Sequence, residues 1–349
     1  MLDYERKKKI FEFLKKNKIL FIENFELKKK SWLKAGGDFE FYIQPSTQTE
    51  IKLILNFFLK NGINYFVVGN LSNIIFRDGL IKTPIINLNK YKDIKIEQTR
   101  EDNIKLQVCS GLSIFKFVNF VSRNLNISGL EGLIGIPGTL GGAIYMNASS
   151  YDSYISEYIK EVEIIDQNGH IINLKKEDLE MQWRSSIFHK MKNSIILSAT
   201  FEFPKKNLSN SEFINRKIEK TRNHRSKFQE KAFPNLGSLF ATKDLYIDIS
   251  NSNYFYKFLN IFNKILTKII LKFSNDNSLI IFRKNLVLIY SLIFNIRSED
   301  PFKLSDRTIN CLINNGSTSA NEAIKTIKKI QQKIKYSQKL ENIIIEEIE

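Results

Sequence analysis

The sequence contains few residues of the kinds that build disulfide frameworks, metal centres or membrane spans. Its 349 residues include only two cysteines, Cys109 and Cys311, and three histidines. Two cysteines without zinc-type spacing argue against a disulfide framework and a structural metal. No run of eighteen apolar residues occurs, because lysines interrupt even the most apolar region, 254–294. We therefore expect no metal site and no stable membrane insertion.

The N-terminal segment 1–18 is charged throughout and lacks the apolar core of a secretory signal. We expect it to form an amphipathic surface helix, and we expect the protein to be cytoplasmic. The formal net charge of +16 allows a nucleic-acid partner. However, the lysines are scattered, and neither an RNA-binding aromatic motif nor a helix-turn-helix pattern occurs. We expect no nucleic-acid partner, and the positive charge can instead attract an anionic nucleotide.

Glycine is concentrated in one place. Residues 128–147 contain six of the fifteen glycines, together with Pro137. Glycine lets a ligand lie against the main chain, where exposed N–H groups can bind phosphate. A second loop, 69–73, interrupts two β-type runs and by itself is typical of a plain hairpin turn. Two such loops favour a cofactor with a diphosphate, although ordinary glycine-rich turns remain the alternative.

Five motifs follow one another in a recognisable order. They are 31–37 (SWLKAGG), 68–73 (VGNLSN), 135–142 (GIPGTLGG) with Asn147, 184–188 (RSSIF) and 237–240 (GSLF). On these motifs the chain resembles the UDP-N-acetylenolpyruvoylglucosamine reductase (UDP-N-acetylmuramate dehydrogenase) family of bacterial cell-wall synthesis, in its shorter type. The resemblance covers about 25–240, is absent from about 250–300 and is faint after Leu304.

The resemblance implies an α+β fold, in which a two-part FAD-binding module of the vanillyl-alcohol oxidase (PCMH-type) fold precedes a C-terminal substrate domain. We place the two FAD-binding subdomains at 1–90 and 91–204 and the substrate domain at 207–349. Apolar spacing predicts helices at 49–60, 114–124, 212–227, 254–273 and 320–334. The run 279–294 fits either a strand or a helix. Asn168-Gly169 predicts a hairpin turn, and Ser317 or Ser319 could cap the last helix.

The family uses FAD to transfer electrons from NADPH to a UDP-sugar, UDP-N-acetylglucosamine enolpyruvate, during peptidoglycan precursor synthesis. Non-covalent flavin binding is expected, since none of the histidines lies in the glycine loops. The family's flavin contacts correspond here to Gly69, Ser72, Asn73, Pro137, Gly138, Gly141, Gly142 and Asn147. The family usually has glycine where this chain has Leu71, which would alter the approach of the backbone there.

Three residues correspond to the family's catalytic groups. Arg184 matches an arginine that can hold the substrate carboxylate through forked hydrogen bonds. Ser238 matches the serine that supplies a proton. The family's C-terminal glutamate is harder to place, because a gapless reading puts Ile343 at its position. Glu341 and Glu347 lie two before and four after that position, and we favour Glu341.

Three further residues are candidates for substrate binding. Tyr151 matches a tyrosine that closes over the family's site, although Ser149 replaces the usual glycine two residues earlier. Arg225 and Lys227, on the charged helix before Ser238, are candidates for the substrate diphosphate. The alternative for both is a solvated helix face.

The segment 250–300 matches no part of the family. It can be a substrate lid, an oligomer contact or a peripheral membrane patch, but the spacing of Phe255, Phe258, Phe262, Ile265 and Ile269 is most typical of core residues. Two other functions stay open: a flavoenzyme acting on another nucleotide sugar or alcohol, and a catalytically silent binding protein. The oligomeric state is not predicted.

Overall fold

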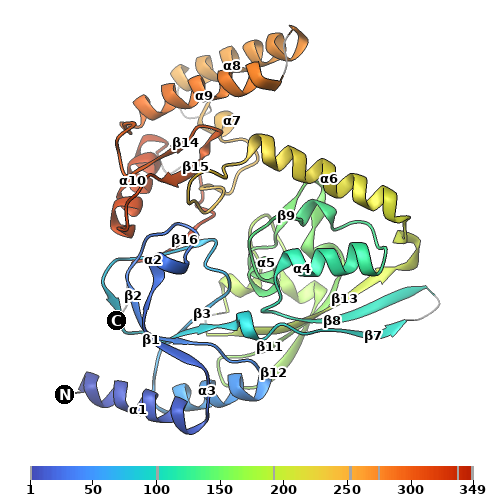
Figure 1. Ribbon diagram of the computed structural model, residues 1–349, viewed down its shortest axis with the longest axis vertical. Coiled ribbons are helices and arrows are strands. Elements are labelled where there is room, and N and C mark those ends of the chain that lie inside the picture. The colour runs from blue at the N-terminus through green and yellow to red at the C-terminus, as the bar shows by residue number, and fades with distance from the viewer. Residues whose placement is uncertain are drawn as a thin grey trace.

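The computed structural model describes residues 2–99, 102–191, 193–250, 254–273, 276–335 and 338–346. Figure 1 shows the N-terminal region and the large antiparallel sheet side by side, with the C-terminal region above them. The helical pair α8 (Tyr254–Phe273) and α9 (Asp276–Ile293) lies at the far end from the N-terminus.

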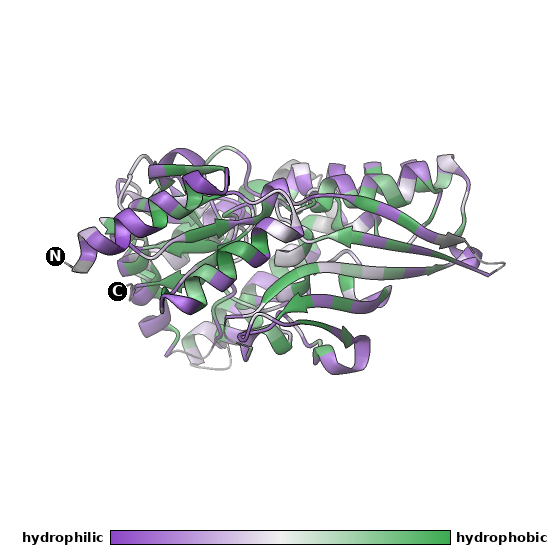
Figure 2. Cartoon of the chain, turned by 90° about the horizontal axis from the view of Figure 1, so that it is seen from below, coloured by the Kyte–Doolittle hydropathy of each residue, from purple (hydrophilic) through white to green (hydrophobic). Residues whose placement is uncertain are grey.

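The first region is a five-stranded sheet in the order β1-β2-β6-β3, with β5 beside β2. β1 is antiparallel to β2, and the other pairs are parallel. Its elements are α1 (Leu2–Lys16), β1 (Phe21–Glu26), α2 (Leu27–Lys30), β2 (Asp38–Ile43), α3 (Gln48–Lys60), β3 (Phe66–Val68), β5 (Leu80–Ile81) and β6 (Ile85–Asn87). The predicted N-terminal amphipathic helix is confirmed: Ile10 and Leu14 of α1 pack with Phe58 of α3 in one core. Figure 2 shows the apolar and polar stripes of such helices.

The second region is an antiparallel sheet in the order β12-β11-β13-β8-β7. Its elements are β7 (Ile94–Thr99), β8 (Asn103–Cys109), α4 (Ile114–Asn119), α5 (Leu140–Tyr145), β9 (Ser149–Ser150), β10 (Ser153–Tyr154), β11 (Ile159–Ile165), β12 (Ile171–Lys175) and β13 (Ile195–Pro204). The hairpin predicted at Asn168-Gly169 is confirmed by the pairing of β11 with β12.

The helix α6 (Ser211–Phe228) joins the core of this second region. Its apolar residues Ile214 and Ile218 are buried in the core of the second region, where α6 packs against residues 120–124 and 131–133. The sequence-based boundary at 204–207 follows the end of β13, but the packing continues to α6. The last turn of α6 also contacts the second glycine loop, because Arg225 donates to Gly132 O at 3.0 Å. The predicted domain boundaries stay a prediction.

The third region surrounds the hairpin of β14 (Phe302–Ser305) and β15 (Thr308–Asn314), together with α7 (Leu245–Ser250), α8, α9 and α10 (Ala320–Lys333). The core contains Tyr290, Phe302 and Ile327. Of the two possible caps, Ser319 accepts the hydrogen bond from Glu322 N at the start of α10. The ambiguous run 279–294 is helical. No helix among the described residues is long and apolar enough to cross a membrane.

The hairpin expected around 69–73 is wrong. β3 pairs with β6, whereas β4 (Ile74–Phe76) pairs in parallel with β16 (Ile343–Ile345). The loop between β3 and β4 thus leads from one sheet to another, because the C-terminal segment returns across the molecule and provides the partner of β4.

The expectation that the apolar residues of α8 form core is also wrong. Phe255, Phe258, Phe262, Ile265 and Ile269 are all exposed. The inner side of α8 instead carries Tyr256, Leu259 and the polar Asn260. Helical spacing places apolar residues on one face of the helix, but it does not determine whether another element covers that face.

Candidate active site

The three regions meet around one cleft of about 2260 Å³. Its lining comes from the two glycine loops, the turn at Arg184, the end of α6, the loop 229–244 and the C-terminal segment at Glu341. Of the predicted site residues, Asn147 and Lys227 do not line this cleft, and the rest do.

The two glycine loops lie directly against each other. A Cβ added at Gly69 would overlap the hydroxyl of Thr139, the residue that caps α5 by accepting a hydrogen bond from Gly142 N. The end of β6 holds the loop at Gly69, because Asn87 Nδ2 donates to Gly69 O at 2.7 Å. Only glycine allows the backbone of this loop to lie so close to the Thr139 side chain. Sequence analysis identified both loops, and the structure shows them as one surface.

This surface fits a flavin nucleotide. A Cβ at Gly138 would meet nothing nearer than Ser72 Oγ at 4.0 Å, so no protein group requires glycine there and the backbone is open to a ligand. Ser110, which lines the cleft beside Gly141, has a buried hydroxyl without a hydrogen-bond partner among the described residues. Buried polar groups normally have partners, so a bound molecule that hydrogen-bonds here is expected.

Leu71 adopts the conformation that glycine would favour. Its φ is +54°, in the left-handed region that is sterically costly for a leucine, and its side chain is buried in the core of the first sheet. The replacement of the family's usual glycine therefore leaves the backbone of the loop left-handed. Burial of the leucine side chain offsets the cost of this conformation.

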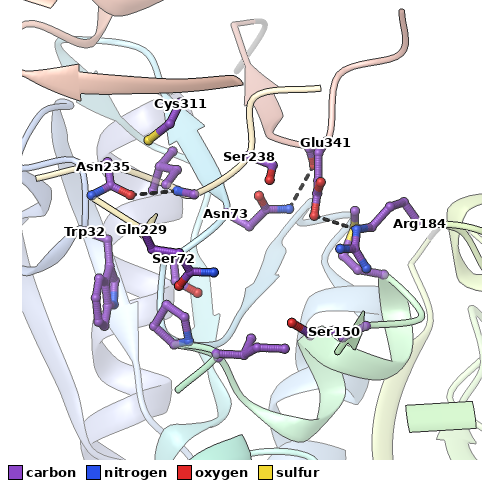
Figure 3. A pocket seen from close by; sticks show the side chains of 18 of the residues that line it. Trp32, Ser72, Asn73, Ser150, Arg184, Gln229, Asn235, Ser238, Cys311 and Glu341 are labelled. Atoms are coloured by element: carbon purple, nitrogen blue, oxygen red, sulfur yellow. Dashed lines mark hydrogen bonds and ion pairs between the residues drawn. The ribbon is translucent and has the colours of Figure 1, made fainter. Parts of the chain in front are cut away.

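Arg184 and Glu341 form an ion pair in the cleft. Arg184 Nε lies 2.7 Å from Glu341 Oε1, and both side chains are largely buried (Figure 3). Arg184 Nη1 also donates to Ser149 Oγ at 3.2 Å. Burial raises the pKa of the Glu341 carboxyl, and the nearby Arg184 charge opposes this only in part. Because Arg184 has φ +53°, its turn is strained and must be held by its surroundings.

Asn147 helps to hold that turn. Its Nδ2 donates to Gln182 O at 2.8 Å, and Gln182 and Ser185 close the turn through two backbone hydrogen bonds. The Oδ1 atom of Asn147 is buried and has no partner among the described residues. The structure thus places Asn147 behind Arg184, next to the glycine loop and outside the lining of the cleft.

Ser238 comes from a different part of the chain and lies next to Glu341. The loop that carries Ser238 lies between two segments: Leu239 N donates to Asn310 O, and Glu341 N donates to Leu239 O, both at 2.9 Å. Figure 3 shows Ser238, Glu341 and Arg184 around the same space. The structure therefore brings all three predicted catalytic residues together, from segments that are far apart in the sequence.

The structure shows which residue of the C-terminal segment pairs with Arg184: it is Glu341. Ile343, which the gapless reading put at the carboxylate position, pairs with Ile74 in the β4–β16 ladder. Glu341 lies just before that strand, at the point where the segment passes Ser238. Glu347 lies outside the described residues. Strand pairing with β4 fixes which residues of this tail face the cleft.

Asn342 is a structural residue that sequence analysis missed. It is buried, and its Nδ2 lies within hydrogen-bond distance of Asn73 Oδ1 (2.8 Å), Ser238 O (3.1 Å) and Leu236 O (3.3 Å). It therefore ties the first glycine loop, the Ser238 loop and the Glu341 segment together. The available signal was one asparagine between Glu341 and a run of isoleucines.

Asn73 of the first glycine loop contacts the C-terminal segment on both sides of Asn342. Its Nδ2 donates to Glu341 O at 2.9 Å, and its carbonyl accepts from Ile343 N at 2.9 Å. A contact of Asn73 with a flavin diphosphate stays a prediction. The observed contacts instead make Asn73 the connection between the flavin loop and the segment that carries Glu341.

Tyr151 and Arg225 lie together on the cleft wall. The Arg225 guanidinium lies 5.0 Å from the Tyr151 ring, and the Tyr151 hydroxyl lies 2.8 Å from His224 Nδ1. Arg225 is buried, donates to Gly132 O and Ser150 Oγ, and pairs with no carboxylate among the described residues. Burial lowers its pKa. A buried cation without a counter-ion favours an anionic ligand.

Lys227 points elsewhere. It is exposed, and its carbonyl accepts a hydrogen bond from Arg307 Nη1 at 3.0 Å. Helical spacing explains the difference, because two residues on a helix are about 200° apart, so Arg225 and Lys227 face opposite sides. The lysines that line the cleft include Lys231 and Lys243.

Comparisons with known proteins agree with this geometry. The family model of the FAD binding domain matches residues 39–175. UDP-N-acetylenolpyruvoylglucosamine reductase of Clostridium novyi is 32% identical over 240 residues, which cover 68% of this chain and 74% of that protein. The enzyme of the same name from Clostridium tetani is 35% identical over 215 residues, covering 61% and 66% of the two chains.

A solved structure shares the fold. The crystal structure of UDP-N-acetylenolpyruvylglucosamine reductase from Thermus caldophilus superposes with a TM-score of 0.65 at 20% identity, covering 93% of this chain and 98% of that one. The expected α+β fold, with its two-part FAD-binding module, is confirmed.

Proposed function

The chain belongs to the UDP-N-acetylenolpyruvoylglucosamine reductase family, and from this premise we propose that it reduces UDP-N-acetylglucosamine enolpyruvate to UDP-N-acetylmuramate with NADPH. The observation that supports this most is the ion pair of Arg184 with Glu341 beside Ser238, in the cleft that the two glycine loops also line. The reaction adds two electrons and two protons across one C=C bond. Bound FAD supplies the two-electron redox chemistry.

Gly69, Ser72, Pro137, Gly138, Gly141 and Gly142 form the wall on which FAD would be held. Their open backbone and the unpartnered Ser110 hydroxyl fit a ligand rich in polar atoms. Non-covalent binding of FAD stays a prediction, as do the individual contacts.

Arg184 binds the carboxylate of the substrate in this proposal. As electrons enter the double bond, negative charge develops on that carboxylate, and a preorganised guanidinium stabilises it. The ion pair with Glu341 and the hydrogen bond to Ser149 hold Arg184 in place beforehand. Because these contacts are already formed, little reorganisation is needed when the charge appears.

Ser238 gives its hydroxyl proton to the carbon beside the carboxylate, which carries the negative charge of the enolate once the other carbon of the double bond has received the hydride. A serine hydroxyl is a weak acid, so it can act only beside a strongly basic enolate and in a fixed position. The hydrogen bonds on both sides of the Ser238 loop provide that position.

Tyr151 and Arg225 are proposed to bind the UDP-sugar, with the buried Arg225 near its anionic part. The cytoplasmic location and the absence of a nucleic-acid partner stay predictions.

A visible spectrum of the purified protein tests this proposal. We expect a flavin spectrum that NADPH bleaches and that UDP-N-acetylglucosamine enolpyruvate restores without oxygen. A bleached flavin that this substrate does not reoxidise would point to another nucleotide sugar or alcohol, or to a silent binding protein. A colourless protein that takes up no added FAD would refute the proposal.

A further inference from the structure

The outer face of α8 carries an exposed apolar row. We call Phe255, Phe258, Ile261, Phe262, Ile265 and Ile269 the α8 stripe; between 48% and 64% of each side chain is exposed. The neighbouring helix α9 adds Ile281 and Leu292, which are 62% and 77% exposed. Soluble proteins rarely expose a continuous apolar area of this kind, so such a patch marks an interaction surface.

The stripe points away from the active site. α8 borders the cleft through Asn263, Lys264, Thr267 and Lys268. At 100° per residue, the centre of the stripe lies roughly 150° around the helix from these residues. The stripe is therefore not the inner face of a substrate lid in this structure. An occupant of the stripe would leave the cleft open.

The charges beside the stripe favour an anionic occupant. Lys257 and Lys268 are exposed on one flank, roughly 110° and 90° around the helix from the centre of the stripe, with Lys268 at the border to the cleft, and residues 254–273 contain no aspartate or glutamate. Two copies joined through this face would bring rows of lysines together, on chains that each carry a net charge of +16. A basic helix with phenylalanine and isoleucine on one face is instead suited to a bilayer whose headgroups are anionic.

We propose that the α8 stripe docks this protein on an anionic phospholipid surface. α8, about 30 Å long, lies in the plane of the interface. Its phenylalanines and isoleucines enter the boundary between headgroups and acyl chains, and the flanking lysines reach the lipid phosphates. The binding is peripheral and keeps the cleft accessible. This inference goes beyond the proposed function and does not depend on it.

Vesicle flotation with the full-length, FAD-loaded protein tests the proposal. The vesicles are phosphatidylcholine alone or phosphatidylcholine mixed with phosphatidylglycerol. The test variant is Phe258→Ser/Phe262→Ser, which removes two aromatic rings from an exposed face. The matched control is Phe115→Ser, because Phe115 is 49% exposed on α4. Lys257→Gln tests charge, since Lys257 lies beside the stripe and does not line the cleft.

We expect the wild-type protein to float with the mixed vesicles, with an affinity that falls as salt is added. The double variant should bind at least about tenfold more weakly, Lys257→Gln should bind more weakly, and Phe115→Ser should bind as wild type. All variants should keep the flavin spectrum and NADPH turnover, which separates this test from the proposed function.

Three results would overturn the inference. One is no binding, or equal binding to both kinds of vesicle. Another is an equal loss of binding in Phe115→Ser. The third is a wild-type dimer, seen by light scattering, that Phe258→Ser/Phe262→Ser converts to a monomer without any vesicle binding; the occupant would then be a second copy.

Discussion

The two walls of the cleft are built in different ways. The glycine-loop wall is made of backbone, and at Gly69 this backbone lies so close to the Thr139 side chain that only glycine fits. The wall around Arg184 is made of side chains from distant segments, joined through Arg184, Glu341 and Asn342. A backbone wall depends on local conformation, whereas a side-chain wall depends on the whole fold. The two should therefore fail in different ways when single residues are changed.

The largest effect is expected for Glu341→Gln. This variant removes the charge that orients Arg184, so kcat should fall about 100-fold or more, while FAD content stays unchanged. Stopped-flow measurement of flavin reoxidation by the enolpyruvyl substrate separates this step from reduction by NADPH. Glu346→Gln is the matched control, since Glu346 lies on the same C-terminal segment as Glu341 but pairs with the exposed Lys328 of α10. Equal kcat for wild type and Glu341→Gln would show that the charge of Glu341 has no role.

A smaller loss of activity is expected for Asn342→Ala. Asn342 does not itself line the cleft but fixes the segments of Ser238 and Glu341, and a small displacement of reacting groups can cost up to about 100-fold in rate. We expect kcat to fall about tenfold or more, with FAD affinity unchanged and KM nearly unchanged. Asn315→Ala changes an exposed asparagine and serves as control. A selective rise in KM would contradict a positioning role.

The backbone wall is tested by two alanines. Gly69→Ala places a methyl group against Thr139, so it should destabilise the protein with and without flavin by about 1–3 kcal/mol. Gly138→Ala meets no protein atom nearer than 4.0 Å, so it should leave the apoprotein as stable as wild type and weaken only FAD binding. Thermal unfolding of apoprotein and holoprotein measures both effects. The same behaviour of the two variants would argue against a flavin beside Gly138.

The smallest effect concerns pH and stability. Burial raises the pKa of the Glu341 carboxyl in the folded protein above its value in the unfolded chain. The free energy of unfolding therefore falls as pH rises through the folded-state pKa. Below the unfolded-state pKa, Glu341 is protonated in both the folded and the unfolded protein, and wild type and Glu341→Gln should be about equally stable. From there to neutral pH, Glu341→Gln should become the more stable of the two. Chemical denaturation at several pH values gives this difference, and the opposite slope would mean that the Arg184 charge outweighs burial.

Much of the backbone wall could be predicted from sequence. Glycines at 69, 138, 141 and 142 indicated a ligand surface, because glycine clusters reflect local backbone requirements. Even here the partner of each strand was missed: β3 and β4 looked like a hairpin because they are neighbours in sequence. The pairing of β4 with β16 joins residues about 270 positions apart, and local patterns do not contain such information.

Helix α8 is a second case in which a local sequence pattern does not predict a tertiary contact. The spacing of Phe255, Phe258 and Phe262 correctly predicted a helix with an apolar face. It did not predict that this face is exposed, because exposure depends on whether another element packs there. In the second region, by contrast, Ile214 and Ile218 of α6 are covered by the core of that region.

The sequence alone therefore determined the glycine loops, most helices, the family resemblance and the choice of Arg184 and Ser238 as catalytic candidates, since each depends on short motifs or on periodicity. The tertiary structure alone decided that Glu341, and not Ile343, faces Arg184. It also decided that Asn342 joins three segments and that the α8 stripe is uncovered. These features depend on strand register and packing between segments that are distant in sequence, and the free energy of such contacts exists only in the folded chain.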